Sequence, residues 1–289
     1  MESLTKELIH LRKEIIRIRG NPRLNPNASI VVPVNAQGDL ENILRLLGDI
    51  TKYTGIYSLE VIVVINNYLP GEPPKEINRF RNLGLRVIDI PNLRKPGEAP
   101  GFTARIPGAE IALSENTIFF DADCRIPNPT ILFDWYIQQF QKGTQATYTR
   151  VDFYDVPGRW SARARILIHH FTRSVKRVIL RIPTIRGSNY AVNRSLLLKL
   201  YRDGILADDM NVGPAVKSVR ARVAYNASKE MRVLTSARMF PGGWIKLFKF
   251  LLYRLRYNIR VLPVRTEAAH FTGRENDPVR RYVNNRQVK

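Results

Sequence analysis

Apolar positions in the first half of the chain follow two alternating patterns. Mainly apolar runs that predict buried strands occur at residues 29–34, 59–65 and 85–90. A strand that is covered on both faces carries such a run because it needs no polar alternation. Helices are expected over residues 39–51 and 102–114, and a fourth strand is expected to end at Asp121. This alternation favours an α/β fold with a parallel, doubly wound sheet.

The flanking parts of the chain are less regular. An amphipathic helix is predicted over residues 4–18, where Leu and Ile recur at spacings of three and four, and it is expected to dock on the main domain. Later helices are expected at residues 129–142, 160–180, 195–201 and 244–257, with short strands at 190–192 and within 222–234. The predicted domains are 1–27 (helix and linker), 28–235 (main domain) and 236–289 (basic helical extension and tail).

The composition points to an anionic partner. The chain has 46 Lys and Arg against 25 Asp and Glu, which gives a net charge of +21. Nucleic acid, anionic lipid and phosphorylated substrates all fit such an excess. The single cysteine, Cys124, excludes an intrachain disulfide and a cysteine-based zinc site. We find no signal-peptide pattern and no run of about 18 apolar residues, so a cytoplasmic protein without a membrane-spanning helix is expected.

Two acidic residues, Asp121 and Asp123, stand at the end of the fourth predicted strand. Side chains at i and i+2 of a strand point the same way, so both carboxylates could converge on one divalent cation. Mg²⁺ and Mn²⁺ favour such oxygen ligands and often share them with substrate phosphates. The alternative is a strand-end turn, where Asp is common. Asn35, Asn66 and Asn67 follow the first two strands, and doubly wound sheets bind ligands beyond these carboxyl ends.

Five sequence segments together carry a family resemblance. They are Ser29–Asn35 (SIVVPVN), Leu59–Asn67 (LEVIVVINN), Ala104–Gly108 (ARIPG) leading into Phe120–Asp123 (FDAD), Gly187–Arg194 (GSNYAVNR) and Ala207–Met210 (ADDM). In residue type, order and spacing these segments resemble those of the family 2 glycosyltransferases, which have a GT-A fold. The resemblance covers roughly residues 28–235.

The resemblance implies a Rossmann-like, mixed and mostly parallel sheet flanked by helices, with a nucleotide-sugar half over 28–125 and an acceptor half over 126–235. It implies inverting transfer of one sugar from a nucleoside-diphosphate sugar to an acceptor hydroxyl, with Mn²⁺ or Mg²⁺. The implied donor-binding residues are Pro33, Asn35, Asn66, Asn67, Arg105 and Asp121. The implied metal ligands are Asp121 and Asp123, the general base is Asp209 or else Asp208, and the acceptor-side residues are Gly187 and Asn189.

The chain departs from the family pattern in three respects. Asn66 and Asn67 stand where an aspartate is usual, although an asparagine can also pair with a base edge. Ile106 replaces the usual Asn after Arg105. The Gln-x-x-Arg-Trp signature of processive synthases is absent from the sequence, which favours transfer of a single sugar.

Some residues allow two interpretations from the sequence. Arg105 could lie near the nucleotide or brace its helix through a salt bridge, and Asp208 and Asp209 could cap a helix. His270 could complete a metal site or be a surface or packing residue. The basic helix at 160–180 could be a solvated face or receive an anionic or lipid-linked acceptor. The acceptor itself is not encoded by any motif that we recognise.

Other classes of function were also considered. A nucleotidyltransferase is disfavoured because no Gly-rich loop with a basic residue follows the first strand, and nucleic-acid binding is disfavoured for lack of its sequence signatures. The remaining alternative is a degenerate GT-A protein that acts as a basic membrane-surface or partner-binding module. The predicted helix at 244–257 has aromatic residues opposite cations, which together with the net charge predicts peripheral association with the inner membrane surface.

Overall fold

The computed structural model describes residues 2–69, 71–91, 100–156, 158, 160–206, 209–237, 248 and 252. Its helices are α1 (Glu2–Arg19), α2 (Asn42–Ile50), α3 (Glu76–Asn82), α4 (Pro100–Ile111), α5 (Pro129–Gln141), α6 (Trp160–Val178), α7 (Arg194–Arg202) and α8 (Val212–Ser218), with a 3₁₀ turn η1 (Asp209–Asn211). Its strands are β1 (Ala28–Asn35), β2 (Leu59–Asn66), β3 (Arg86–Asp89), β4 (Asn116–Phe119), β5 (Ala146–Thr149), β6 (Val151–Phe153), β7 (Tyr190–Asn193), β8 (Val223–Asn226) and β9 (Val233–Thr235).

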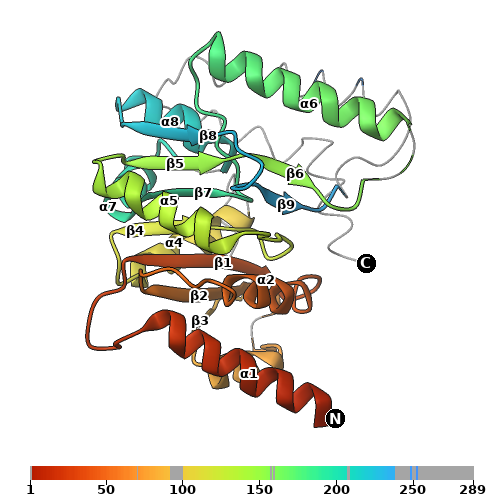
Figure 1. Cartoon of the computed structure of the whole chain (residues 1–289), viewed down its shortest axis with the longest axis vertical. Helices are drawn as coiled ribbons and strands as arrows, with labels where there is room; N and C mark the ends of the chain where they lie inside the picture. The colour runs from red at the N-terminus through yellow and green to blue at the C-terminus, as the bar shows by residue number, and fades with distance from the viewer. Residues whose placement is uncertain are drawn as a thin grey trace.

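Seven of these strands form one mixed sheet in the order β3-β2-β1-β4-β7-β5-β8 (Figure 1). Strand β7 runs antiparallel to both of its neighbours, β4 and β5, whereas the other pairs are parallel. The predicted α/β fold with a mostly parallel sheet flanked by helices is confirmed. The purely parallel sheet suggested by strand and helix alternation alone is wrong at β7, because the chain enters β7 at the edge where its neighbours end.

Both faces of the sheet are buried. Along β1, Ile30, Val32 and Val34 belong to one apolar cluster, which also takes in side chains of α2 and α5. Val31 points to a second cluster, shared with α4, α7 and α8. The two-sided covering explains why β1 and β2 are continuous apolar runs instead of alternating ones.

Helix α1 docks on the main domain, as its apolar stripe predicted. Ile15 and Ile18 are buried in the first cluster, and Leu8 and Leu11 pack against it. Arg17 donates from Nη2 to the carbonyls of residues 51 and 53, each at 2.8 Å. Figure 1 shows α1 and α6 at opposite ends of the molecule, with the sheet between them.

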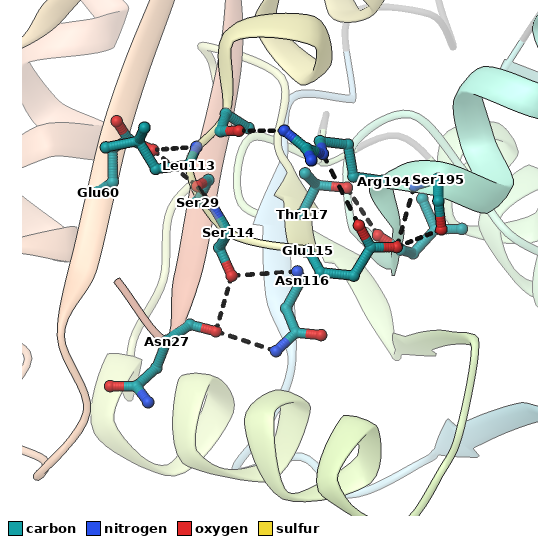
Figure 2. A network of polar contacts seen from close by, with 12 residues as sticks. Asn27, Ser29, Glu60, Leu113, Ser114, Glu115, Asn116, Thr117, Arg194 and Ser195 are labelled. Atoms are coloured by element: carbon teal, nitrogen blue, oxygen red, sulfur yellow. Dashed lines mark hydrogen bonds and ion pairs between the residues drawn. The ribbon is translucent and has the colours of Figure 1, made fainter. Parts of the chain in front are cut away.

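A polar network fastens the amino-terminal edge of the sheet (Figure 2). The buried Glu60 carboxylate accepts hydrogen bonds from Ser29 Oγ at 2.7 Å and from the Leu113 amide at 3.1 Å. Ser114 donates through its hydroxyl to the Asn27 carbonyl at 3.0 Å. The network joins β1 and β2 to the turn before β4. Asn35 and Asn66 lie at the opposite edge of the sheet, where β1 and β2 end.

Several elements were not expected from the sequence. α3, β5 and β6 are short, from three to seven residues, so no clear apolar period marks them. The two short strands expected within 222–234 form, but β8 joins the main sheet and β9 pairs with β6. The helix expected at 244–257 lies outside the described residues except for positions 248 and 252. Across the described residues, no helix has the length and apolarity needed to cross a membrane.

Candidate active site

Polar residues from three strands meet at the carboxyl edge of the sheet. Asn35 at the end of β1 lies opposite Asn66 at the end of β2 in the parallel register. Strand β4 runs parallel to β1 and ends at Phe119, two residues before Asp121. Parallel strands end at the same edge, so Asn35, Asn66 and Asp121 lie on one side of the sheet, where such folds bind ligands.

The two acidic residues lie in a turn and not on the strand itself. β4 ends at Phe119, and the turn at Asp121 is closed by a hydrogen bond from the Cys124 amide to the Asp121 carbonyl at 3.0 Å. The expectation that the strand continues to Asp121 is therefore wrong by two residues. The Asp121 side chain is 42% exposed, whereas Asp123 is buried and Thr235 donates to its Oδ1 at 3.4 Å.

Arg105 of α4 joins two carboxylates that are far apart in the chain. Its Nη2 donates to Asp121 Oδ1 at 2.5 Å, and its Nη1 donates to Asp209 Oδ2 at 2.5 Å. Nη2 also donates to the Gly187 carbonyl at 2.9 Å. Of the two expectations for Arg105, the salt bridge is the one seen here, and it extends well beyond the residue's own helix.

The guanidinium of Arg105 is completely buried and remains charged. Burial by itself would lower the pKa of Arg105, but Asp209 and Asp121 outweigh burial and hold the pKa above its ordinary value. A buried cation of this kind is stable only with such anionic partners. Arg105 thereby fixes the 20% exposed side chain of Asp209 close to Asp121.

Gly187 packs directly against this charged group. A Cβ atom at this position would lie 2.6 Å from Asp209 Oδ2 and 2.9 Å from Arg105 Nη2. Both contacts are closer than real Cβ atoms allow, so glycine is the residue that fits this arrangement. The structure thus places Gly187 beside Asp209, the expected general base.

The asparagines of the expected base pocket contact one another. Asn67 Nδ2 donates to Asn35 Oδ1 at 2.9 Å, and the Gln37 amide donates to the same oxygen at 3.0 Å. Asn67 has a left-handed backbone with a φ of 64°, which asparagine tolerates better than most residues. Asn66 is half-buried at the sheet edge.

Pro33 is buried in the middle of β1, where a proline normally removes a ladder hydrogen bond. The Val31 carbonyl accepts from the Phe120 amide, so the backbone of Pro33, two residues on, faces the same side. The pairing of β4 with β1 extends only from Ser29 to Val31. Pro33 therefore lies just beyond the paired part of β1 and β4.

Asn189 lies inside the protein. Tyr136 donates a hydrogen bond to Asn189 Oδ1, and Asn189 Nδ2 donates to Thr149 Oγ1 at 2.6 Å. Both ends of its side-chain amide are thus engaged by protein groups from α5 and β5. Asn189 therefore differs from Gly187, which packs against Asp209 and Arg105, although both residues were expected on the acceptor side.

Two residues near the carboxylates were missed by sequence reasoning. The fully buried Tyr190 stacks on Phe119 with ring centroids 4.8 Å apart. Burial raises the pKa of the Tyr190 phenol well above its ordinary value, and the charge of Asp209 raises it further. Cys124 donates from Sγ to the Ser188 carbonyl at 3.2 Å, which ties the turn of Asp121 to the segment of Gly187. In the sequence, the only indication that Tyr190 lies near the site was its position three residues after Gly187.

The donor set suits a divalent cation that shares its ligands with a substrate. Within the described residues, no group of three or more His, Cys, Asp or Glu side chains is arranged to hold a metal. The half-exposed Asp121 and the buried Asp123 supply carboxylate oxygens, and Mg²⁺ and Mn²⁺ commonly complete such a set with phosphate oxygens and water. Asp208 and His270 lie outside the described residues.

No protein-family model matches the sequence, and no curated protein matches it. Among solved structures, it is similar to the mannosyltransferase PcManGT from Pyrobaculum calidifontis in complex with GDP-Man and Mn²⁺, at 16% identity, covering 97% of this chain and 87% of that chain, with a TM-score of 0.48.

Two further structures show comparable similarity. Glucosyl-3-phosphoglycerate synthase from Mycobacterium tuberculosis, in complex with Mn²⁺, UDP-glucose and phosphoglyceric acid, is 16% identical, with 88% and 83% of the two chains covered and a TM-score of 0.46. TarS of S. aureus is 17% identical, with 84% of this chain but 41% of that chain covered and a TM-score of 0.47. These are likenesses of fold, so the chemistry of this chain has to be argued from its own residues.

Proposed function

We propose that this protein is an inverting glycosyltransferase that moves one sugar from a nucleoside-diphosphate sugar to an acceptor hydroxyl. The observation that carries the proposal is the Arg105 guanidinium, which holds Asp121 and Asp209 together at the carboxyl edge of the sheet. Asp121 belongs to the candidate metal and donor side, and Asp209 is the candidate base. The transfer reaction uses a base on the acceptor side of the anomeric carbon and neutralisation of charge on the leaving diphosphate at the other side.

In the proposed step, the acceptor oxygen attacks the anomeric carbon from the face opposite the leaving nucleoside diphosphate. The new C–O bond forms as the bond to the β-phosphate oxygen breaks, and the leaving diphosphate takes that electron pair. Arg105 orients Asp209 through Oδ2, and the Asp209 carboxylate takes the acceptor proton. A single displacement of this kind inverts the configuration of the sugar.

Asp121 and Asp123 would hold the divalent metal, and Mn²⁺ or Mg²⁺ would neutralise charge on the diphosphate as it leaves. Asn35, Asn66 and Asn67 would meet the base, since amides offer both a donor and an acceptor to a base edge. Pro33 would shape the wall of the same pocket. Gly187, having no side chain, would let the Asp209 carboxylate and Arg105 pack against the backbone of the acceptor-side segment.

A binding screen tests the donor class. We expect one family of nucleoside diphosphates and their sugars to raise the melting temperature of the full chain in the presence of Mn²⁺, because a ligand of the native state stabilises it. Asp123→Asn should weaken this metal-dependent shift, and Asp209→Asn should keep the shift but lose turnover. Release of nucleoside diphosphate and the anomeric configuration of the product, followed by NMR, measure turnover and inversion.

Asp203→Asn is the matched control, because this exposed aspartate follows α7 and is not one of the residues assigned to the site. It should change neither binding nor turnover. A donor that binds without any turnover in the unaltered protein would favour the degenerate, partner-binding alternative. If no nucleotide shifted the melting temperature, the proposed transferase function would be wrong.

We also propose that the molecule associates with an anionic membrane surface through α6. Four large apolar side chains of this helix, Trp160, Leu167, Phe171 and Val178, are 66–71% exposed. Their spacings of seven, four and seven residues place them on one face. Residues 156–202 contain no Asp or Glu, so α6 itself carries no acidic side chain. If the full chain did not co-sediment with anionic vesicles at moderate salt, this proposal would fail.

A further inference from the structure

A second candidate binding site lies beside β8, the last strand of the seven-stranded sheet. A cavity of about 510 Å³ opens between the last turns of α6 and α8 and the start of β8. β8 runs parallel to β5, so its first residue, Val223, lies at the edge opposite to the carboxyl ends of the parallel strands. In Figure 1 this end of α6 and helix α8 lie on the left, whereas the arrowheads of β1 and β5 point to the right.

The charged side chains that line this cavity are all cationic: Arg177, Arg181, Lys217 and Arg220. In the described part of the chain, none of the four forms an ion pair with a carboxylate. The segments that supply them, residues 156–202 and 210–229, contain no Asp or Glu at all. Like charges gathered without counter-charges repel one another, so an anionic ligand would relieve the repulsion.

Two of these arginines have a backbone conformation that normally belongs to glycine. Helices α1, α3, α5 and α7 are each followed by a left-handed glycine, namely Gly20, Gly84, Gly143 and Gly204. The helices beside the cavity, α6 and α8, are followed instead by Arg181 with a φ of 50° and Arg220 with a φ of 55°. Asn67 is the one other non-glycine residue with a positive φ in the described chain.

A left-handed arginine is strained because its Cβ crowds the backbone, and glycine would remove this strain. A favourable interaction with the helix dipole does not explain the choice, since Lys176 and Lys217 already place cations in the last turns of α6 and α8. Strain of this kind persists where the side chain has a use. Both arginines line the same cavity, which suggests a shared use.

The other walls suit an organic ligand. The Arg177 guanidinium lies 4.0 Å from the ring centroid of Tyr225, and Lys217 Nζ donates to the Leu180 carbonyl at 3.0 Å, so two of the cations are held in place. Tyr148, Pro183 and Val223 add apolar lining. Guanidinium groups match phosphate oxygens with paired hydrogen bonds, and apolar walls receive the rest of a small molecule.

We infer that this cavity binds a ligand that carries two or more phosphate charges. The same chemistry is presented by a soluble phosphate ester and by the headgroup of a phospholipid. The inference does not depend on sugar transfer, because it uses no residue of the Asp121–Arg105–Asp209 group.

Calorimetry on the full chain in EDTA tests the inference, with inorganic pyrophosphate as the soluble probe and phosphatidylcholine vesicles with or without phosphatidic acid as the lipid probe. EDTA keeps a metal at Asp121 and Asp123 from taking part. We expect the double variant Arg181→Gly/Arg220→Gly to weaken binding about tenfold or more, since each loses charge-assisted hydrogen bonds to phosphate. The same variant should keep or raise the melting temperature without ligand, because glycine relieves the left-handed strain.

Arg12→Gln/Arg45→Gln is the matched control, since it removes the same charge from exposed sites on α1 and α2. Pyrophosphate binding that is lost only in the glycine variant would support a soluble ligand. Binding to phosphatidic acid vesicles alone that is weakened only in the glycine variant would support a lipid headgroup. Equal weakening in both double variants, or no binding of either probe, would overturn the inference. Should the glycine variant not fold, Lys217→Gln makes the same comparison with Arg45→Gln as its control.

Discussion

At the scale of single residues, the candidate active site depends on a few close contacts around Arg105. This guanidinium contacts Asp121, Asp209 and the Gly187 carbonyl at the same time, so each partner limits the positions of the others. Asp121 keeps considerable exposure while Asp209 is more enclosed. The position of the Asp209 carboxylate, the proposed base, should therefore depend more on its neighbours than the position of Asp121 does.

Gly187→Ala should move the Asp209 carboxylate out of position for its proposed role as general base. The added Cβ would displace Asp209 Oδ2, and because a shift of about 1 Å at a reacting group can have such an effect, turnover should fall about a hundredfold. The overcrowding should also destabilise the fold by about 1–3 kcal/mol. Release of nucleoside diphosphate and thermal denaturation measure these two effects.

The control for this substitution is Gly48→Ala in α2, where an added Cβ meets nothing within 4 Å. Because alanine is the better helix former, this variant should keep full turnover and be slightly more stable. Normal turnover of Gly187→Ala would mean that the position of Asp209 does not matter to the reaction.

At the scale of elements, α2 is tied to the chain that follows the acidic turn. The buried Asp49 of α2 accepts from Arg125 Nε at 2.7 Å and from the Ile126 amide at 3.1 Å. Burial alone would raise the pKa of Asp49, but the hydrogen bonds from Arg125, Lys52 and Ile126 lower it below its ordinary value of 3.8. This contact therefore joins a helix on one face of the sheet to the segment just after Asp121 and Asp123.

The stability that this contact supplies should depend on pH. Since the folded-state pKa lies below the unfolded one, the stabilisation is complete above the unfolded pKa and is lost as pH falls through the folded pKa. Asp49→Asn should lower the free energy of unfolding by about 1–3 kcal/mol at neutral pH, and the difference should shrink below pH 3.8. Urea denaturation at several pH values measures it.

Asp203→Asn should leave the same denaturation curves unchanged, because this aspartate is exposed. A stability difference between Asp49→Asn and the unaltered protein that stayed constant down to acid pH would contradict an electrostatic role for Asp49.

At the scale of the whole molecule, the carboxylates lie at the carboxyl edge of the sheet, whereas the cationic cavity lies beside β8 and the last turn of α6. The exposed apolar stripe runs along the same helix, α6, at one end of the molecule (Figure 1). Changes at well-separated surfaces without shared contacts usually act independently. Membrane association and donor binding should therefore be separable by mutation.

Leu167→Gln/Phe171→Gln should weaken co-sedimentation with anionic vesicles, because it removes exposed apolar area from the centre of the stripe. Donor-induced stabilisation should not change in this variant. Leu24→Gln/Ile56→Gln is the control, since these side chains are 64% and 90% exposed but lie elsewhere. Equal losses of vesicle binding in the two variants would rule out a specific role for α6.

The sequence by itself determined most strands and helices of the first half, though not α3, and where polar groups follow them. Continuous apolar runs predicted β1 and β2, and these runs end at Asn35 and Asn66 because burial ends there. A local pattern of this kind suffices because burial on both faces acts on every residue of a central strand. Short strands such as β5 and β6 escaped prediction, since three or four residues carry too little pattern.

Only the tertiary structure decided which distant residues act together. Arg105 and Asp209 are separated by 104 positions, and no local period relates them. Asn189 was expected to face an acceptor, yet its amide is engaged inside the protein by Tyr136 and Thr149. The left-handed conformations of Arg181 and Arg220 are likewise invisible in the sequence, where both look like ordinary surface cations. Such contacts depend on how whole elements pack, because only packing brings charges and close approaches from separate segments into one place.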